Sequence, residues 1–257
     1  MNPILHSKVL GKGKPLCILH GFLGMSDNWK TLGNSYSENG FNVHLIDQRN
    51  HGKSFHSTGF NYDLLAMDLK NYLDHHGLKS THLIGHSMGG KTAMQFACTY
   101  SNWVDKLLVA DIAPKYYPPH HSTIIDALNK IDLNEISSRN DADDQLKRNI
   151  PDFGTRQFLL KNLYRNNDKR LRFRFNLPVL DKRMEDIGEN INNTDIFDGP
   201  TLFLKGDRSE YVVENDMTEI KKHFPNAEME TITDAGHWLH AENPEQFLEK
   251  SLKFLNS

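Results

Sequence analysis

The sequence has few cysteines, no long apolar run and no excess of charge of one sign. Its two cysteines, Cys17 and Cys98, lie far apart in apolar stretches and form no CxxC pair. This excludes a disulfide-framework protein and predicts two buried, reduced thiols in a reducing compartment. The 30 basic and 33 acidic residues give a net charge of −3. We therefore expect neither nucleic acid nor an anionic membrane as a partner, because both require clustered positive charge.

The apolar stretches are too short for a membrane protein. The longest purely aliphatic stretches are short, such as residues 107–110, whereas a membrane-spanning helix needs about 20 apolar residues. Residues 1–9 show no charged-then-apolar secretion signal, so we expect a cytoplasmic protein. The apolar content is ordinary for a globular protein, and 257 residues fit one large α/β domain or two small ones.

Short apolar runs alternate with segments of helical periodicity over most of the chain. The later runs alternate only partly, which is typical of strands that are covered on both faces. The pattern predicts an α/β fold with a mostly parallel central sheet flanked by helices. The expected strands are 4–9, 16–19, 43–46, 82–84, 107–110, 201–205 and 227–232, with a hairpin turn at 11–14, and the expected helices cover 62–73, 93–100 and a last segment beginning after Asn243.

The region from about Ala113 to Asp198 breaks this alternation. Prolines interrupt short helical stretches at 122–128 and 156–164, and apolar residues alternate with arginines over 170–177, as in an edge strand. We interpret 113–198 as a helical lid inserted into one core domain, which residues 1–112 and 199–257 form together.

The segment Gly85-His86-Ser87-Met88-Gly89 lies between an expected strand and an expected helix. In this context G-x-S-x-G is typical of a nucleophile elbow, in which the serine occupies a sharp, strained turn. Glycine is needed on both sides because the strand and the helix pass too close for side chains. Ser87 is therefore the candidate nucleophile.

Two further segments supply what such a serine needs. Acyl transfer requires two backbone N–H groups aimed at the developing oxyanion, one from the residue after the nucleophile and one from an early strand–helix loop. Met88 and Phe22, within His20-Gly21-Phe22-Leu23-Gly24, fit these places. His237, in the loop before the last helix, is the candidate base because it follows the serine in the chain order Ser…Asp…His.

Together these segments resemble the α/β-hydrolase family over nearly the whole chain. The sequence is especially similar to a group of small bacterial esterases, and to a eukaryotic mitochondrial relative of them. The shared segments are DQRNHGKS at 47–54, GHSMGGK at 85–91 and DIAP at 111–114. The resemblance implies an α/β-hydrolase core and serine-dependent cleavage of carboxylic esters or thioesters, with no metal and no organic cofactor.

The acid of the triad has two candidate positions. Most of the superfamily places it after the strand that follows the lid, in a G-x-x-D pattern, but here Ser209 occupies that position in Gly206-Asp207-Arg208-Ser209. Asp111 ends the preceding core strand, at the active-site edge of a parallel sheet, and the resemblance implies this position. We predict Asp111, with Asp207 as the alternative and a supporting role for Ser209 near His237.

Two other functions compete with an esterase. Residues 85–92, GHSMGGKT, also satisfy the phosphate-loop pattern, and 107–111 resemble the strand and aspartate that hold Mg²⁺ in nucleotide hydrolases. A phosphate loop normally follows the first core strand, however, and this hypothesis leaves the HGFLG segment and His237 unexplained. The second alternative is a non-catalytic binding protein with the hydrolase fold.

The expected substrate is a small-molecule ester with a short or medium acyl chain. Aromatic residues of the insertion either line the acyl pocket or pack the lid onto the core; they are Tyr116, Tyr117, Phe153, Phe158 and Phe173. The pairs His75-His76 and His120-His121 predict no metal site, because adjacent helical residues point to different faces. Substrate-binding residues and the oligomeric state are not readable from the sequence.

Overall fold

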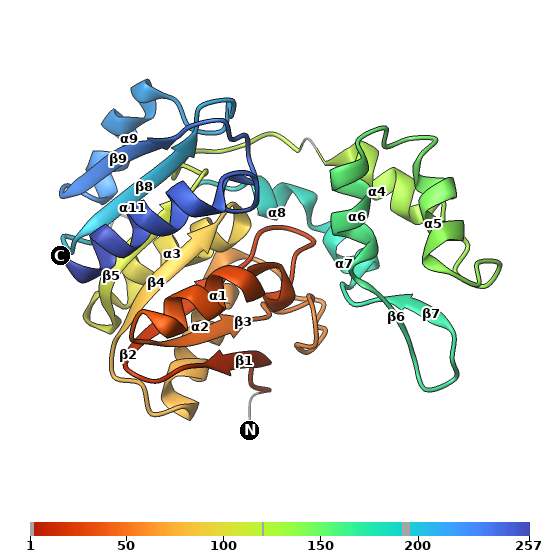
Figure 1. Ribbon diagram of the computed structural model, residues 1–257, viewed down its shortest axis with the longest axis horizontal. Coiled ribbons are helices and arrows are strands. Elements are labelled where there is room, and N and C mark those ends of the chain that lie inside the picture. The colour runs from red at the N-terminus through yellow and green to blue at the C-terminus, as the bar shows by residue number, and fades with distance from the viewer. Residues whose placement is uncertain (1–2, 120, 192–195) are drawn as a thin grey trace.

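A seven-stranded sheet lies at the centre of the chain, and the inserted region lies to one side of it (Figure 1). The computed structural model describes residues 3–119, 121–191 and 196–257. All strands are parallel except the first, and this confirms the predicted α/β class. In spatial order they are β1 (Ser7–Leu10), β3 (Phe41–Ile46), β2 (Lys14–Leu19), β4 (Thr81–His86), β5 (Val104–Ala110), β8 (Thr201–Gly206) and β9 (Ala227–Ile232).

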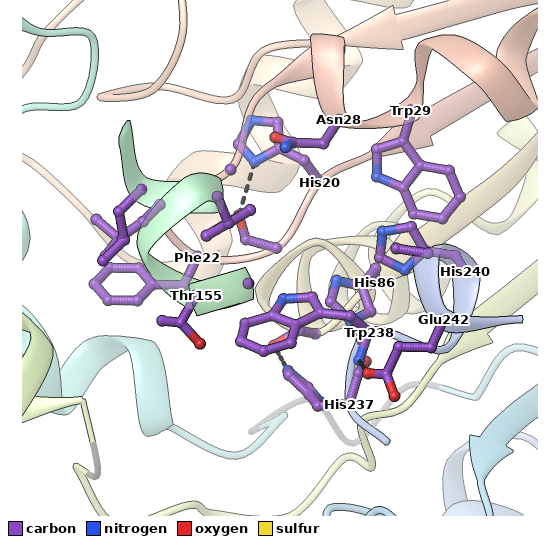
Figure 2. A pocket seen from close by; sticks show the side chains of 18 of the residues that line it. His20, Phe22, Asn28, Trp29, His86, Thr155, His237, Trp238, His240 and Glu242 are labelled. Carbon is purple, nitrogen blue, oxygen red and sulfur yellow. Dashed lines mark hydrogen bonds between the residues drawn. The ribbon is translucent and has the colours of Figure 1, made fainter. Parts of the chain in front are cut away.

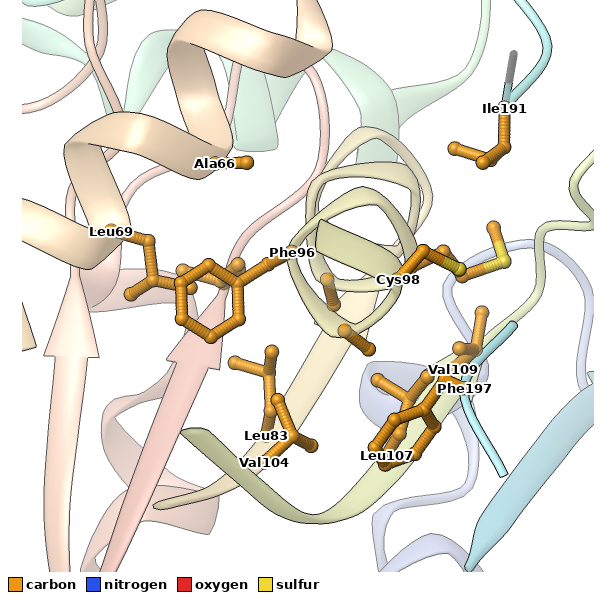
Figure 3. Close-up of a cluster of buried hydrophobic side chains, with 14 of the residues drawn as sticks. Ala66, Leu69, Leu83, Phe96, Cys98, Val104, Leu107, Val109, Ile191 and Phe197 are labelled. Carbon is orange, nitrogen blue, oxygen red and sulfur yellow. The ribbon is translucent and has the colours of Figure 1, made fainter. Parts of the chain in front are cut away.

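Helices cover both faces of the sheet, as the partial alternation in the strands predicts. The side chains of Leu16 and Ile18 enter a cluster with α1 (Lys30–Glu38) and α11 (Pro244–Asn256). Cys17 and Leu19 point to the opposite face and join the cluster shown in Figure 3. The helices on that face are α2 (Tyr62–His75), α3 (Met88–Thr99) and α9 (Met217–His223).

Four shorter helical segments complete the main domain. They are η1 (Ser26–Trp29), η2 (Ser101–Trp103), η3 (Glu214–Asp216) and α10 (Leu239–Glu242). Within the part of the chain that the structure describes, no helix is both long and apolar enough to cross a membrane.

The predicted hairpin between the first two strands is wrong. β1 pairs antiparallel with β3, and β2 lies on the other side of β3. The connection therefore crosses the end of β3, where Gly11 and Gly13 adopt φ of 70° and 127°. A Cβ at Gly11 would lie 2.5 Å from the Phe41 carbonyl oxygen, so glycine permits a crossing that the local sequence alone did not reveal.

The inserted region forms short helices and a small antiparallel hairpin. A helix begins at Phe153, because the Asp152 carboxylate caps the Thr155 N–H at 2.6 Å, and it ends at Leu160, earlier than predicted. The predicted extended run is a strand only at its start. The elements are α4 (Ser122–Asn129), α5 (Arg139–Leu146), α6 (Phe153–Leu160), β6 (Leu163–Arg165), β7 (Leu171–Phe173), α7 (Leu177–Lys182) and α8 (Met184–Gly188).

A buried lysine joins the two ends of the insertion to the core. Lys91 of α3 donates through Nζ to the carbonyl oxygens of Lys115 at 2.6 Å and Gly188 at 3.1 Å, and also to that of Glu189. Burial lowers the pKa of Lys91 to about 7. The ammonium group that the phosphate-loop hypothesis assigned to a nucleotide is thus engaged by backbone carbonyls, which counts against that hypothesis.

Two glycines allow the stability cost of a steric clash at the crossing to be distinguished from the cost of a positive φ. Gly11 and Gly77 have nearly equal φ, 70° and 65°, but a Cβ at Gly77 meets no atom within 4 Å. We expect Gly77→Ala to cost about 1 kcal/mol of unfolding free energy, and Gly11→Ala to cost on the order of 1–3 kcal/mol more through overpacking. Thermal melts of both variants test this, and equal melting temperatures would contradict it.

Candidate active site

Ser87 occupies a sharp turn between β4 and α3. Its φ is 53°, in the left-handed region that non-glycine residues seldom adopt. A Cβ at Gly85 would lie 2.3 Å from the Gly89 carbonyl oxygen, and a Cβ at Gly89 would lie 2.4 Å from that of Leu19. Both glycines are therefore required for the reason that the sequence pattern suggested, and the turn presents the Ser87 hydroxyl at the carboxyl edge of the sheet.

The structure brings Ser87, His237 and Asp111 together. His237 Nε2 lies 3.0 Å from Ser87 Oγ, and His237 Nδ1 lies 2.8 Å from Asp111 Oδ2. Asp111 directly follows β5, with a φ of 52°, and His237 lies in the loop between β9 and α10. The three side chains thus form one hydrogen-bonded series across three strand ends.

Asp111 is completely buried but well supplied with hydrogen-bond donors. Its Oδ1 accepts the Gly206 N–H at 3.1 Å, and its Oδ2 accepts the Ser209 hydroxyl in addition to His237. Burial raises the pKa of Asp111 to about 6, although the bonds from Ser209 and Gly206 oppose this shift. Ser209 therefore lies near His237 because both side chains contact Asp111.

Asp207 lies outside this series. Its exposed carboxylate accepts the backbone N–H groups of Asp234 and Ala235, each at 3.0 Å, and these bonds lower its pKa. Asp207 therefore fixes the start of the loop that carries His237, whereas Asp111 contacts the imidazole itself.

Two neighbours of His237 carried no recognisable signal in the sequence. The Tyr211 ring stacks on the imidazole with centroids 3.8 Å apart and an interplanar angle of 16°. His86 Nε2 lies 2.8 Å from the His237 carbonyl oxygen, and burial holds the pKa of His86 well below its usual value. A neutral His86 can donate this bond without placing a second positive charge beside His237.

The loop after β2 lies directly against Ser87. A Cβ at Gly21 would lie 3.3 Å from Ser87 Cβ, so the Phe22 backbone that follows is next to Ser87. Met88 is the first residue of α3, where helix geometry leaves its N–H without an acceptor in the helix. In the described ranges neither the Phe22 nor the Met88 N–H donates to a protein acceptor.

Residues of the DQRNH segment support this loop. Gln48 donates its backbone N–H to His20 Nε2 at 3.0 Å and its side-chain amide to the His20 carbonyl at 2.8 Å. The Leu23 N–H donates to His51 Nε2 at 3.3 Å. Burial lowers the pKa of His51 to about 3, so this nitrogen remains an acceptor near neutral pH. The segment was recognised by resemblance, but its contacts could not be read from the sequence.

A cavity of about 280 Å³ opens beside Ser87 and His237 (Figure 2). Five aromatic residues of the insertion were expected either to line an acyl pocket or to pack the lid onto the core. Phe158 lines this cavity, and Tyr117 lines a smaller one of about 20 Å³ that also contacts Ser87. Phe173 packs against the buried cluster shared by the insertion and the core, and it stacks on Phe175. Phe153 and Tyr116 are 65% and 48% exposed, so the expectation is wrong for these two. The larger cavity is also lined by Phe22, Asn28, Trp29, His86, Thr155, Trp238, His240 and Glu242.

The histidines of the two pairs differ in their position relative to this cavity. His75 and His76 are exposed at the end of α2, while His121 lines both cavities. His120 lies outside the described residues. Over residues 3–119, 121–191 and 196–257, no three His, Cys, Asp or Glu side chains are grouped as metal ligands would be.

Comparison with known proteins places this geometry in context. Residues 14–244 match the family described as the alpha/beta hydrolase fold. The chain is 37% identical over 252 residues to the sn-1-specific diacylglycerol lipase of Danio rerio, covering 95% of this chain and 79% of that protein. It is 35% identical to the esterase YbfF of Escherichia coli, covering 94% and 93%. A solved esterase from a marine microorganism is 42% identical, with a TM-score of 0.96 over 98% of this chain and all of that one.

The raised pKa of Asp111 predicts how stability depends on pH. The folded protein binds this proton more tightly than the unfolded chain, so the stabilisation is complete below about pH 4 and is lost as pH rises through about 6. Relative to Asp111→Asn, the wild type should lose on the order of 2 kcal/mol of unfolding free energy across this range. Urea denaturation at several pH values measures this difference.

Asp207→Asn provides the control with the opposite sign. Because the pKa of Asp207 is lowered in the folded state, its contribution is present above the unfolded pKa and is lost as pH falls. A wild-type advantage over Asp111→Asn that stayed constant from pH 4 to pH 7 would contradict the assigned environment of Asp111.

Proposed function

Since the chain belongs to the α/β-hydrolase family and is a carboxylic ester hydrolase, we propose that Ser87, His237 and Asp111 are its nucleophile, base and acid. One observation supports this assignment above all others, the unbroken series of hydrogen bonds from Ser87 Oγ through both imidazole nitrogens to Asp111. A serine hydroxyl is a weak nucleophile until such a base removes its proton.

The reaction proceeds in two halves. His237 Nε2 takes the proton from Ser87 Oγ as the oxygen attacks the ester carbonyl, and the tetrahedral intermediate expels an alcohol, which receives that proton. Water then gives a proton to His237 Nε2, attacks the acyl-Ser87 ester and releases the carboxylic acid, while the proton returns to Ser87. Throughout, Asp111 accepts the Nδ1–H bond, which fixes the tautomer and stabilises the imidazolium.

The backbone N–H groups of Phe22 and Met88 are the proposed oxyanion hole. Both lie next to Ser87 and have no competing acceptor in the described ranges, so they are available for the negative oxygen of each intermediate. Such preorganised donors contribute on the order of 10²–10³ in rate each. Gln48 and His51, by fixing the loop that carries Phe22, hold one of these donors in place.

The proposed substrate is a neutral ester with a short or medium acyl chain. The cavity volume of about 280 Å³ is at the small end of the range for ligand pockets, roughly 300–1,000 Å³. Among the residues that the structure describes, its lining contains the Glu242 carboxylate and no lysine or arginine. Burial lowers the pKa of His20, His86 and His240, which keeps them uncharged near neutral pH. The lipase and esterase names of the relatives agree with an ester substrate.

The region 113–198 is the proposed lid over this site. Its helix α6 supplies Phe158 and Thr155 to the cavity, and Lys91 secures both of its ends to the core. We further propose a cytoplasmic protein that uses neither nucleic acid nor a membrane as a partner. The near balance of charge and the two buried cysteines outside any disulfide, Cys17 and Cys98, support this proposal.

The two carboxylates near His237 give opposite predictions. Asp111→Asn should lower kcat by on the order of 10⁴, because the amide favours the wrong imidazole tautomer. Asp207→Asn should keep kcat within about tenfold, since Asp207 contacts only backbone and one acceptor oxygen remains. Initial rates on p-nitrophenyl butyrate measure both, with Ser87→Ala as the inactive reference. The reverse ranking would exclude Asp111 as the acid.

A substrate series tests the proposed cavity. Across p-nitrophenyl acetate, butyrate, octanoate and palmitate, kcat/KM should peak at butyrate or octanoate and fall at least tenfold for palmitate. A monosuccinate ester, similar in length to the butyrate but negatively charged, should also be at least tenfold poorer, because no lysine or arginine among the described residues lines the cavity. A preference for palmitate, or equal rates on the charged and neutral esters, would contradict this proposal.

A further inference from the structure

The loop that carries His237 is fixed by side chains from outside it. Asp207 holds its start, and His86 donates to the His237 carbonyl oxygen at 2.8 Å. Glu242, the last residue of α10, reaches back to the same loop (Figure 2). We propose that Glu242 is a positioning residue for His237, an inference that depends on the role of His237 as the base in the proposed function.

The Glu242 carboxylate accepts hydrogen bonds from the residues immediately before and after His237. Its Oε2 accepts the Gly236 N–H at 2.9 Å, and its Oε1 accepts the Trp238 N–H at 3.3 Å. One carboxylate thus receives the backbone N–H groups on both sides of His237.

The peptide bond after His237 is held at both ends. Its carbonyl oxygen is that of His237, which accepts from His86, and its N–H is that of Trp238, which donates to Glu242. The plane of this peptide bond determines ψ of His237 and therefore where the imidazole points. The imidazole has to keep 2.8 Å to Asp111 and 3.0 Å to Ser87 at the same time, which tolerates little rotation.

A carboxylate suits this task better than its amide analogue. Glu242 offers two acceptor oxygens to two N–H donors, whereas glutamine offers one oxygen and would turn its NH₂ group toward the second N–H. Glu242 is exposed, so its removal leaves no buried cavity and uncovers no core. Its loss should therefore disturb the orientation of His237 much more than the stability of the fold.

The experiment compares Glu242→Ala and Glu242→Gln with Glu249→Ala, a control in which an exposed glutamate of the neighbouring helix α11 is removed. We expect Glu242→Ala to lower kcat by about tenfold to a hundredfold on p-nitrophenyl butyrate, as for a misplaced catalytic group. KM should stay within about twofold, and Glu242→Gln should lie between alanine and the wild type. Glu249→Ala should match the wild type.

Two further measurements separate positioning from stability. The rate at which a fluorophosphonate phosphonylates Ser87 reports activation of the serine by His237 without the ester substrate, and it should fall by the same factor as kcat. The melting temperature of Glu242→Ala should change by only a few degrees. A kcat loss that tracks the melting temperature, with unchanged phosphonylation of the folded protein, would overturn the proposal.

The outcomes also distinguish this inference from the proposed function. If both Glu242 variants keep wild-type kcat while Ser87→Ala is inactive, Glu242 does not position the base and the triad stands. If His237→Ala retains activity, the proposed function itself fails. Should Glu242→Ala not fold, the comparison of Glu242→Gln with the wild type decides, because it retains the side-chain length and one acceptor.

Discussion

The site depends on one backbone contact, in which the turn at Ser87 packs against the end of β2. A Cβ at Gly89 would lie 2.4 Å from the Leu19 carbonyl oxygen and 2.6 Å from that of His20. Because glycine permits this approach, the strained serine and the loop that carries Phe22 are pressed together by the packing of the core. Ser87, the proposed nucleophile, and the proposed oxyanion donors are therefore held by the same packed backbone. Their alignment follows from this backbone packing and does not depend on the rearrangement of a side chain.

Burial also makes the histidines near the site differ in their protonation, because it lowers the pKa of some of them. The pKa of His51 is lowered to about 3 and that of His86 falls well below its usual value, so both serve as neutral hydrogen-bond partners of backbone groups. His237 differs because its Nδ1 lies 2.8 Å from the Asp111 carboxylate, not against a backbone group. A cluster of similar side chains thus contains one proposed base and two neutral histidines that hold backbone groups in place.

The sequence allowed prediction of those parts whose causes are local. Two-sided strands, the glycines around Ser87 and the strand end at Asp111 each follow from nearby residues, and the structure has them where they were expected. The position of β1 beside β3 depends on pairing between distant segments, so the turn residues at 11–14 led to the wrong prediction of a hairpin. Contacts such as those of Tyr211 and Glu242 depend on the conformation of loops around the packed core. Hydrophobic periodicity in the sequence predicts helices and strands but not these loop conformations.

The position of the proposed acid, Asp111, is linked to the residue type at position 209. Position 209 contacts Asp111, and a carboxylate there would put two negative charges in one buried site, raising at least one pKa and forcing a proton onto the pair. Serine at this position instead donates a hydrogen bond to Asp111, and the Gly206 N–H donates a second. With the proposed acid at the end of β5 and not at the end of β8, position 209 supplies a hydrogen-bond donor, and this bond opposes the rise that burial causes in the pKa of Asp111.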